Sequence, residues 1–181
     1  MGINLYKDLP AYKDEYSEVL NVVIDIPKYS SNKYEYDEDK GYFALDRVLY
    51  SQMFYPFDYW FVPQTKAEDG DAVDVIQLVT YPTFPGCVIK SRIIGFLEAA
   101  DEDGPDNKII TVPVSKVDPR FDEIETYEDL PSHYLEELKI HFKEIKKLEK
   151  KKYDKVEIGD FHGPDVAKKH LTEAINNFQQ S

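Results

Sequence analysis

The stretch Glu68-Asp69-Gly70-Asp71-Ala72-Val73-Asp74-Val75 decides how this chain is organised. It sets four carboxylates within seven residues, and the apolar run that it enters continues to Val79. Alternation within that run predicts a β-strand. Gly70 permits a sharp turn, so that Asp69 and Asp71 can surround one point in space. Carboxylate oxygens arranged in this way are typical of a site for a hard cation.

The predicted strand leaves open what Asp74 contacts. Asp74 would share one face with Ile76 and Leu78, whereas Val73 and Val75 would lie on the other face. A carboxylate there requires a partner, because burial of an unpaired charge is costly. The alternative is an ordinary solvated Asp-Gly-Asp turn, which is common on surface loops. An EF-hand fits poorly, since its spacing would place Val73 at a ligand position and Asp74 at the glycine.

Composition favours one folded domain and an acidic surface. The chain has 181 residues with 42% hydrophobic and 14% aromatic content, which is enough for a substantial core. We expect a single domain over residues 1–181, with residues 1–18 as a surface lead-in. The formal net charge of −13 disfavours a partner such as nucleic acid or an anionic membrane, which requires a basic face.

Neither disulfides nor targeting signals are indicated. Cys87 is the single cysteine, which excludes an internal disulfide and a thiolate zinc site. No apolar stretch approaches the length of a membrane span, and the N-terminus lacks a basic region followed by a hydrophobic one. We therefore expect a soluble, cytoplasmic protein.

Short strands alternate with turns through the first two thirds of the chain. Their spacing predicts a small closed or nearly closed β-barrel. An aromatic-rich segment over residues 53–62 is interpreted as core or barrel lining. The predicted strands cover residues 19–26, 33–37, 42–50, 73–79, 87–98 and 109–114.

The last third of the chain changes to a helical period. An apolar stripe predicts a helix that begins near Asp129 or Ser132, and a second stripe predicts another helix after Gly163. The lysine run over residues 143–155 is interpreted as the solvated face of the first helix plus a loop. The two stripes are Leu135, Leu138, Phe142, Ile145 and Leu148, then Ala167, Leu171, Ala174, Ile175 and Phe178.

Two acidic turns are predicted to meet at the barrel mouth, because each lies at a strand end. One holds Asp69, Asp71 and Asp74, and the other is the acidic stretch over residues 101–106. With lysine, arginine and tyrosine nearby, this set suits phosphoryl chemistry with several Mg²⁺ ions, which prefer carboxylates, water and substrate phosphates. The cationic side chains would take the charge of a leaving phosphate. The sequence has no P-loop, zinc-protease motif or nucleophile elbow.

The segment Asp69–Val75 resembles the signature of the soluble family I inorganic pyrophosphatases, D-x-D-[PE]-x-D-x. The resemblance extends over residues 19–175. It implies an OB-like, five-stranded β-barrel with flanking strands and two helices in the C-terminal half, an α+β fold that is mainly β. Other matching segments are Val23–Pro27, Lys33–Glu35, Leu45–Arg47, Met53–Pro56, Tyr59, Asp101–Glu102, Asp106–Lys108, Asp129–Pro131 and Leu148–Lys150.

The resemblance also implies a function and a role for each site residue. The expected reaction is Mg²⁺-dependent hydrolysis of pyrophosphate to two orthophosphates, without a covalent enzyme intermediate. Asp71 would be the catalytic base, and the short chain implies a homohexamer of the bacterial and archaeal type. By similarity, the ligands of several Mg²⁺ ions are Asp69, Asp74, Asp101, Asp106 and Glu35. By similarity, the phosphate-binding residues are Lys33, Arg47, Tyr55, Tyr59, Lys108 and Lys146.

Four positions depart from the family pattern. Asp25 replaces a glutamate, Trp60 a glycine and Ala72 a proline. Ile145 stands where the family has a phosphate-binding tyrosine, so we expect weaker phosphate binding. These departures keep an alternative open, a weakened or non-catalytic member that binds phosphate or a protein partner. An OB-type nucleic-acid binder is a further alternative, but the cationic groove of such proteins is missing.

Overall fold

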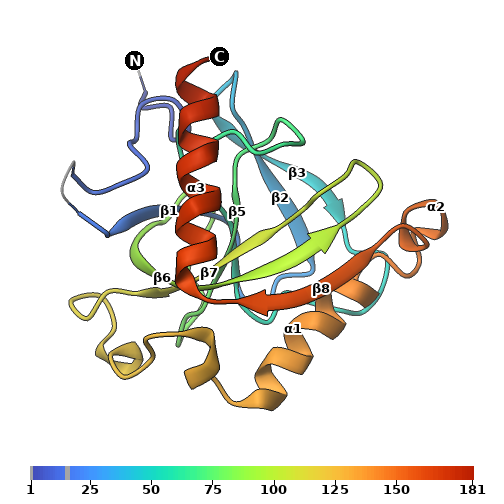
Figure 1. Ribbon diagram of the computed structural model, residues 1–181. Coiled ribbons are helices and arrows are strands. Elements are labelled where there is room, and N and C mark those ends of the chain that lie inside the picture. Colours follow the sequence, from blue (N-terminus) through green and yellow to red (C-terminus); the bar gives the residue numbers. More distant parts are fainter. Residues whose placement is uncertain (1, 15–16) are drawn as a thin grey trace.

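The computed structural model describes residues 2–14 and 17–181 of the chain (Figure 1). Its strands are β1 (Leu20–Ile26), β2 (Asn32–Asp37), β3 (Tyr42–Val48), β4 (Asp58–Phe61), β5 (Asp74–Gln77), β6 (Val88–Ala100), β7 (Lys108–Pro113) and β8 (Glu157–His162). Its helices are the 3₁₀ turns η1 (Pro119–Phe121) and η2 (Tyr127–Asp129), then α1 (Ser132–Glu144), α2 (Lys150–Tyr153) and α3 (Pro164–Gln179).

Five strands form a closed ring. The order is β1-β4-β5-β7-β6, and pairing of β1 with β6 closes the circle. Only β5 and β7 run parallel within this ring, while the other ring pairs are antiparallel. Outside it, β8 pairs with β6, and β2 and β3 form a separate hairpin. The predicted five-stranded barrel with flanking strands is therefore confirmed.

The two faces of the barrel wall bury two apolar clusters. In β7, Ile109 packs in one cluster with Leu171 of α3, whereas Ile110 packs in the other with Leu138 of α1. Successive strand residues point to opposite faces, so a continuous apolar strand can serve both helices. Figure 1 shows α3 crossing the barrel and α1 lying near β8. Each face of the barrel wall therefore packs against a helix.

A β-bulge in β1 changes which face its side chains occupy. Ile24 pairs with Trp60 and Ile26 with Tyr59, so Asp25 is an extra residue without an opposite partner in β4. Ile24 packs in the α3-side cluster, whereas Ile26 packs in the α1-side cluster. An extra residue shifts the alternation in this way. The bulge also leaves the Asp25 carboxyl fully buried.

Two predictions for the C-terminal third need correction. The first helix ends at Glu144, so Leu148 lies beyond it and is 57% exposed instead of continuing the stripe. The lysine-rich region contains a one-turn helix, α2, and strand β8 follows it, although the sequence indicated neither. The β8 sequence has little β-propensity, but pairing with the long strand β6 overrides this. Gly159 allows the approach, since a Cβ there would lie 2.8 Å from Glu98 Cβ.

The N-terminal segment is more buried than its polar composition indicated. Tyr6 and Ala11 are each only 5% exposed, and Tyr6 packs edge-on against Phe61 and Phe178. The segment therefore lies against the barrel and the end of α3. Across the described residues, every helix is too short or too polar to cross a membrane.

Candidate active site

One cavity of about 820 Å³ lies at the mouth of the barrel. Its walls come from the β2–β3 hairpin, the starts of β5 and β7, the loops before them, and the end of α1. All twelve side chains predicted from the sequence line it, namely Lys33, Glu35, Arg47, Tyr55, Tyr59, Asp69, Asp71, Asp74, Asp101, Asp106, Lys108 and Lys146. The structure thus brings together segments that lie far apart in the chain.

Parallel pairing of β5 and β7 creates the centre of the site. Asp74 and Lys108 are the first residues of these strands and are register partners. Lys108 Nζ lies 2.7 Å from Asp74 Oδ2 and also pairs with Asp106 Oδ1. The Tyr59 hydroxyl donates to the same Asp74 oxygen. Asp74 therefore has the partners that a carboxylate in a strand requires.

Burial perturbs the charges at this centre. Burial raises the pKa of Asp106 to about 7, although Lys108 acts against this shift. For Lys108 itself, which is 1% exposed, burial lowers the pKa, but Asp74 and Asp106 outweigh it and the net shift is upward. The lysine thus stays charged between two carboxylates. This arrangement holds Asp74 and Asp106 side by side without any ion.

The loop before β5 presents two carboxylates to the cavity. Gly70 adopts a left-handed φ of +97°, and Asp69 Oδ1 accepts from the Asp71 backbone N at 3.0 Å. Burial raises the pKa of Asp71, and the neighbouring charges of Asp69 and Asp74 add to this rise. Within residues 2–14 and 17–181, Asp71 forms no ion pair. Asp71 is therefore an unneutralised acid at the edge of the site.

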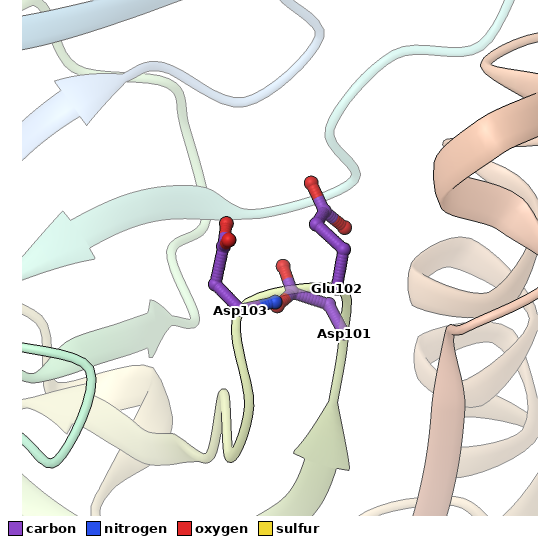
Figure 2. A group of neighbouring side chains, drawn as sticks. All are labelled: Asp101, Glu102 and Asp103. Carbon is purple, nitrogen blue, oxygen red and sulfur yellow. The ribbon is translucent and has the colours of Figure 1, made fainter.

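The second acidic loop follows β6 and is compensated by lysines. Asp101, Glu102 and Asp103 hold carboxylate oxygens within 4.8 Å of one another, and Figure 2 shows these side chains on the loop. Lys146 Nζ lies 2.6 Å from Asp101 Oδ2 and 3.1 Å from Glu102 Oε2. Lys152 reaches Glu102 from α2 at 2.5 Å. Burial would raise the pKa of Glu102, but the bond from Lys152 and the contacts with Lys146 lower it to about 2.

The β2–β3 hairpin supplies further positive charge. Lys33 and Arg47 are register partners, so both side chains reach the cavity from neighbouring strands. Lys33 pairs with Glu35, and its Nζ lies 5.0 Å from the centroid of the Trp60 ring. Arg47 pairs with Asp46 and, at 3.5 Å, with Glu149. The cavity therefore combines carboxylates with a fixed guanidinium and several ammonium groups.

The ligand set fits a hard divalent cation. The acidic groups offer only oxygen donors, the type that Mg²⁺ prefers. Burial and mutual repulsion raise the pKa values of both Asp71 and Asp106, and bound cations would relieve that repulsion. Asp69, Asp74 and Asp106 are not a ready-made cage, since the one tight carboxylate group found in the described part of the chain is Asp101–Asp103. They instead line the same cavity around Lys108.

Three of the departures from the family pattern now have a physical setting. Asp25 does not line the cavity; it is fully buried, and its Oδ2 accepts from the Tyr36 backbone N at 2.8 Å. Trp60 lies against Tyr59 and under Lys33, so it adds a cation–π contact. Ile145 is 8% exposed and forms an apolar part of the wall.

Sequence reasoning missed some residues that line the cavity. Glu102 had the same signal as Asp101, its position in the second acidic turn, but was not singled out as a ligand. Lys152 was assigned to a solvated lysine run, because no periodic signal distinguishes it from Lys150 or Lys151. Trp60 is identified from the sequence only as a replacement for a glycine of the family pattern. The contact between Lys33 and its ring depends on tertiary structure.

Fold and site together define a class of protein, a small β-barrel whose mouth combines a group of carboxylates with lysine, arginine and tyrosine side chains. A family model described as inorganic pyrophosphatase matches residues 22–179. The chain belongs to this family, whose activity is the hydrolysis of diphosphate.

Individual relatives agree over nearly the whole chain. The inorganic pyrophosphatase of Geobacillus stearothermophilus is 46% identical over 164 residues, which cover 91% of this chain and 96% of the relative. That of Aquifex pyrophilus is 43% identical, with 97% of each chain covered. The crystal structure of inorganic pyrophosphatase from Thermus thermophilus superposes with a TM-score of 0.90 at 39% identity, covering 98% of this chain and 99% of the other.

Proposed function

We propose that this protein hydrolyses inorganic pyrophosphate to two orthophosphates by direct attack of water, with Mg²⁺ as cofactor. The observation that carries the proposal is the single cavity in which two acidic loops face lysine, arginine and tyrosine side chains. A condensed phosphate has a high negative charge and oxygen ligands on every side. It needs both hard cations and fixed donors to bind.

Asp71 is the proposed general base. Its carboxylate faces the cavity without an ion-pair partner in the described chain, and its raised pKa makes it a better proton acceptor than an ordinary aspartate. Asp69 orients the loop by accepting from the Asp71 backbone N. Asp71 therefore receives the proton of the attacking water, and no protein group needs to form a bond to phosphorus.

Magnesium ions would be held by Asp69, Asp74, Asp101, Asp106 and Glu35. When bound, such ions supply positive charge to the phosphate oxygens and lower the pKa of water. Lys108 keeps Asp74 and Asp106 together before the ions arrive. Glu35 is delivered from the opposite wall by the β2–β3 hairpin.

Phosphate oxygens would be bound by Lys33, Arg47 and Lys146, with Tyr55, Tyr59 and Lys108 in support. Arg47 offers a planar set of donors whose orientation is fixed by Asp46 and Glu149. These groups bind the substrate and stabilise the charge on the departing orthophosphate.

The organisation of the whole protein is part of the proposal. We propose one domain over residues 1–181, a homohexamer and a cytoplasmic location. The length and motif resemblance to short-chain members of the family support the oligomer, and the single cysteine suits a reducing compartment.

The test is release of orthophosphate from pyrophosphate by the purified protein. We expect turnover with Mg²⁺ and none after removal of metal with a chelator, with recovery on adding Mg²⁺ back. Omitting the protein and substituting orthophosphate for pyrophosphate are the controls. Absence of turnover at every Mg²⁺ concentration would instead favour the non-catalytic alternative.

A further inference from the structure

The N-terminal segment lies across two site-bearing parts of the molecule. One is the β2–β3 hairpin, which carries Lys33, Glu35 and Arg47, and the other is the connection from β4 to β5, which carries Asp69 and Asp71. We propose that residues Asn4–Lys7 act as a positioning strap that fixes these two walls of the cavity relative to each other. The inference rests on the proposed function, because it assigns the strap a role in binding the activating cations.

On one side, the strap bonds to the hairpin. The Leu5 backbone N donates to the Tyr36 hydroxyl at 2.8 Å, and Asn4 Nδ2 donates to the Glu38 carbonyl at 2.8 Å. Gly41 turns the hairpin with a φ of +72°, and a Cβ there would lie 3.4 Å from the Tyr36 hydroxyl. The strap lies beside this turn, since the same Cβ would be 3.9 Å from Asn4 Nδ2.

On its other side, the strap bonds to the start of the β4–β5 connection. The Gln64 backbone N donates to the Tyr6 carbonyl at 3.1 Å, and Gln64 Nε2 donates to the Lys7 carbonyl at 2.9 Å. The Tyr6 hydroxyl donates to the Thr65 carbonyl at 2.7 Å. Gln64 has a φ of +53°, a left-handed conformation that is unfavourable for a residue with a side chain. The two bonds to the strap hold it there.

Hydrogen bonds continue from these attachment points to site residues. Thr65 Oγ1 accepts from the Val73 backbone N at 2.9 Å, next to Asp74. The Ala67 backbone N donates to the Asp71 carbonyl at 2.7 Å. In the hairpin, Tyr36 directly follows Glu35 in β2. A shift at either attachment point would therefore move a carboxylate of the site.

Electrostatic repulsion between the two walls of the cavity is the force that the strap would resist. On the hairpin wall Glu35 is paired with Lys33, but Glu38 faces the loop that carries Asp71, so these two carboxylates repel each other across the cavity. Burial raises the pKa of Glu38 to about 7, and the nearby charge of Asp71 adds to this rise. A strap that resists separation keeps the ligands preorganised. Cations bind more tightly to a site that needs no rearrangement.

Two variants test the strap, one on each side. Tyr36→Phe removes the hydroxyl that accepts from Leu5 while keeping the buried ring, and Gln64→Ala removes the side-chain bond to Lys7. Lys7→Arg is the matched control, because it keeps the positive charge that acts on Glu38, and among the described residues the Lys7 ammonium forms an ion pair only with the exposed Asp39. Mg²⁺ binding is measured by calorimetry without substrate, together with kcat at saturating Mg²⁺ and the unfolding midpoint.

We expect both variants to bind Mg²⁺ about five- to tenfold more weakly, as for one lost hydrogen bond, and Lys7→Arg to match the wild type. At saturating Mg²⁺ their kcat should return to within about twofold of the wild type, because bound cations remove the repulsion. Unchanged Mg²⁺ affinity with a lower unfolding midpoint would overturn the strap and leave a purely structural segment. Absence of turnover in the wild type would overturn the proposed function, whereas calorimetry would still decide on the strap.

Discussion

The two acidic loops of the cavity differ in how their charge is balanced. The loop after β6 is neutralised by the protein itself, since Lys146 and Lys152 pair with its carboxylates. The loop before β5 holds Asp69 and Asp71, neither of which forms an ion pair within the described residues. Burial and like charge shift the pKa of Asp71 upward, whereas the pKa of Glu102 is lowered to about 2.

This difference separates two tasks at one site. A carboxylate paired with lysine is held in place but is a poor proton acceptor, whereas an unpaired carboxylate remains available as a base or a cation ligand. The loop after β6 is therefore held by ion pairs within the protein, whereas the loop before β5 is held by hydrogen bonds and leaves its carboxylates unpaired among the described residues. Lys108 stands between the two loops, because it pairs with Asp74 on one side and Asp106 on the other.

The largest effect is expected at the uncompensated loop. Asp71→Asn keeps the size and the backbone bond to Asp69 but removes the proton acceptor, so kcat for pyrophosphate should fall by about 10²–10⁴-fold. The measurement is phosphate release at saturating Mg²⁺. Asp103→Asn is the matched control, because Asp103 lines the cavity from the other loop and has no assigned role. Equal rates for Asp71→Asn and the wild type would refute the assignment of the base.

Replacing Lys108, which links the two loops, should have the next largest effect, a loss of stability. Lys108→Met leaves Asp74 and Asp106 facing each other with no compensating charge, and loss of one partner of a buried ion pair costs about 3–5 kcal/mol. Unfolding in denaturant with a chelator should show this loss. With Mg²⁺ present the loss should shrink, because cations would take over the neutralisation. A deficit that is the same with and without Mg²⁺ would contradict the placement of cations at Asp74 and Asp106.

Much of this organisation could be predicted from the sequence because it depends on local patterns. Alternation and apolar runs predicted four of the five ring strands, and the spacing of Asp69, Asp71 and Asp74 marked the site. The remaining ring strand, β4, was interpreted only as part of an aromatic lining segment. The pairing of Lys108 with two carboxylates, the bulge at Asp25 and the short strand β8 depend on contacts between distant segments. Local propensity gives no signal for them, since neighbouring strands impose the geometry.

A smaller effect, on KM for pyrophosphate, is expected at Ile145, which forms an apolar part of the cavity wall. Ile145 precedes Lys146 and lines the cavity without a polar group. Ile145→Tyr should lower KM for pyrophosphate about tenfold relative to Ile145→Phe, because the added hydroxyl can donate to a charged phosphate, a bond of about 1.5–3 kcal/mol. Phenylalanine controls for the strain of a larger ring in the wall. Equal KM values for the two variants would show that no phosphate oxygen lies within reach of position 145.

The pH dependence of stability distinguishes Asp106, in the loop before β7, from His141, on helix α1. Asp106 has a folded pKa of about 7, above its ordinary value of 3.8, so its contribution to stability is complete below pH 3.8 and is lost as pH rises through 7. His141 has the opposite sign. Burial lowers its pKa from 6.5 to about 3, so its contribution is present above pH 6.5 and is lost as pH falls toward 3. Between pH 7 and pH 5 the two groups oppose each other.

Replacing His141 should therefore reveal the pH-dependent stability that Asp106 contributes. His141 packs among Tyr55, Phe57 and Phe142, and its Nε2 is buried without a hydrogen-bond partner in the part of the chain described, so His141→Phe loses no bond there. In a chelator, the unfolding midpoint of His141→Phe should fall less between pH 7 and pH 5 than that of the wild type, or should rise. Added Mg²⁺ should reduce any rise, because a cation keeps Asp106 ionised. If the unfolding midpoints of the two proteins change in the same way with pH, the titration of other groups determines stability in acid.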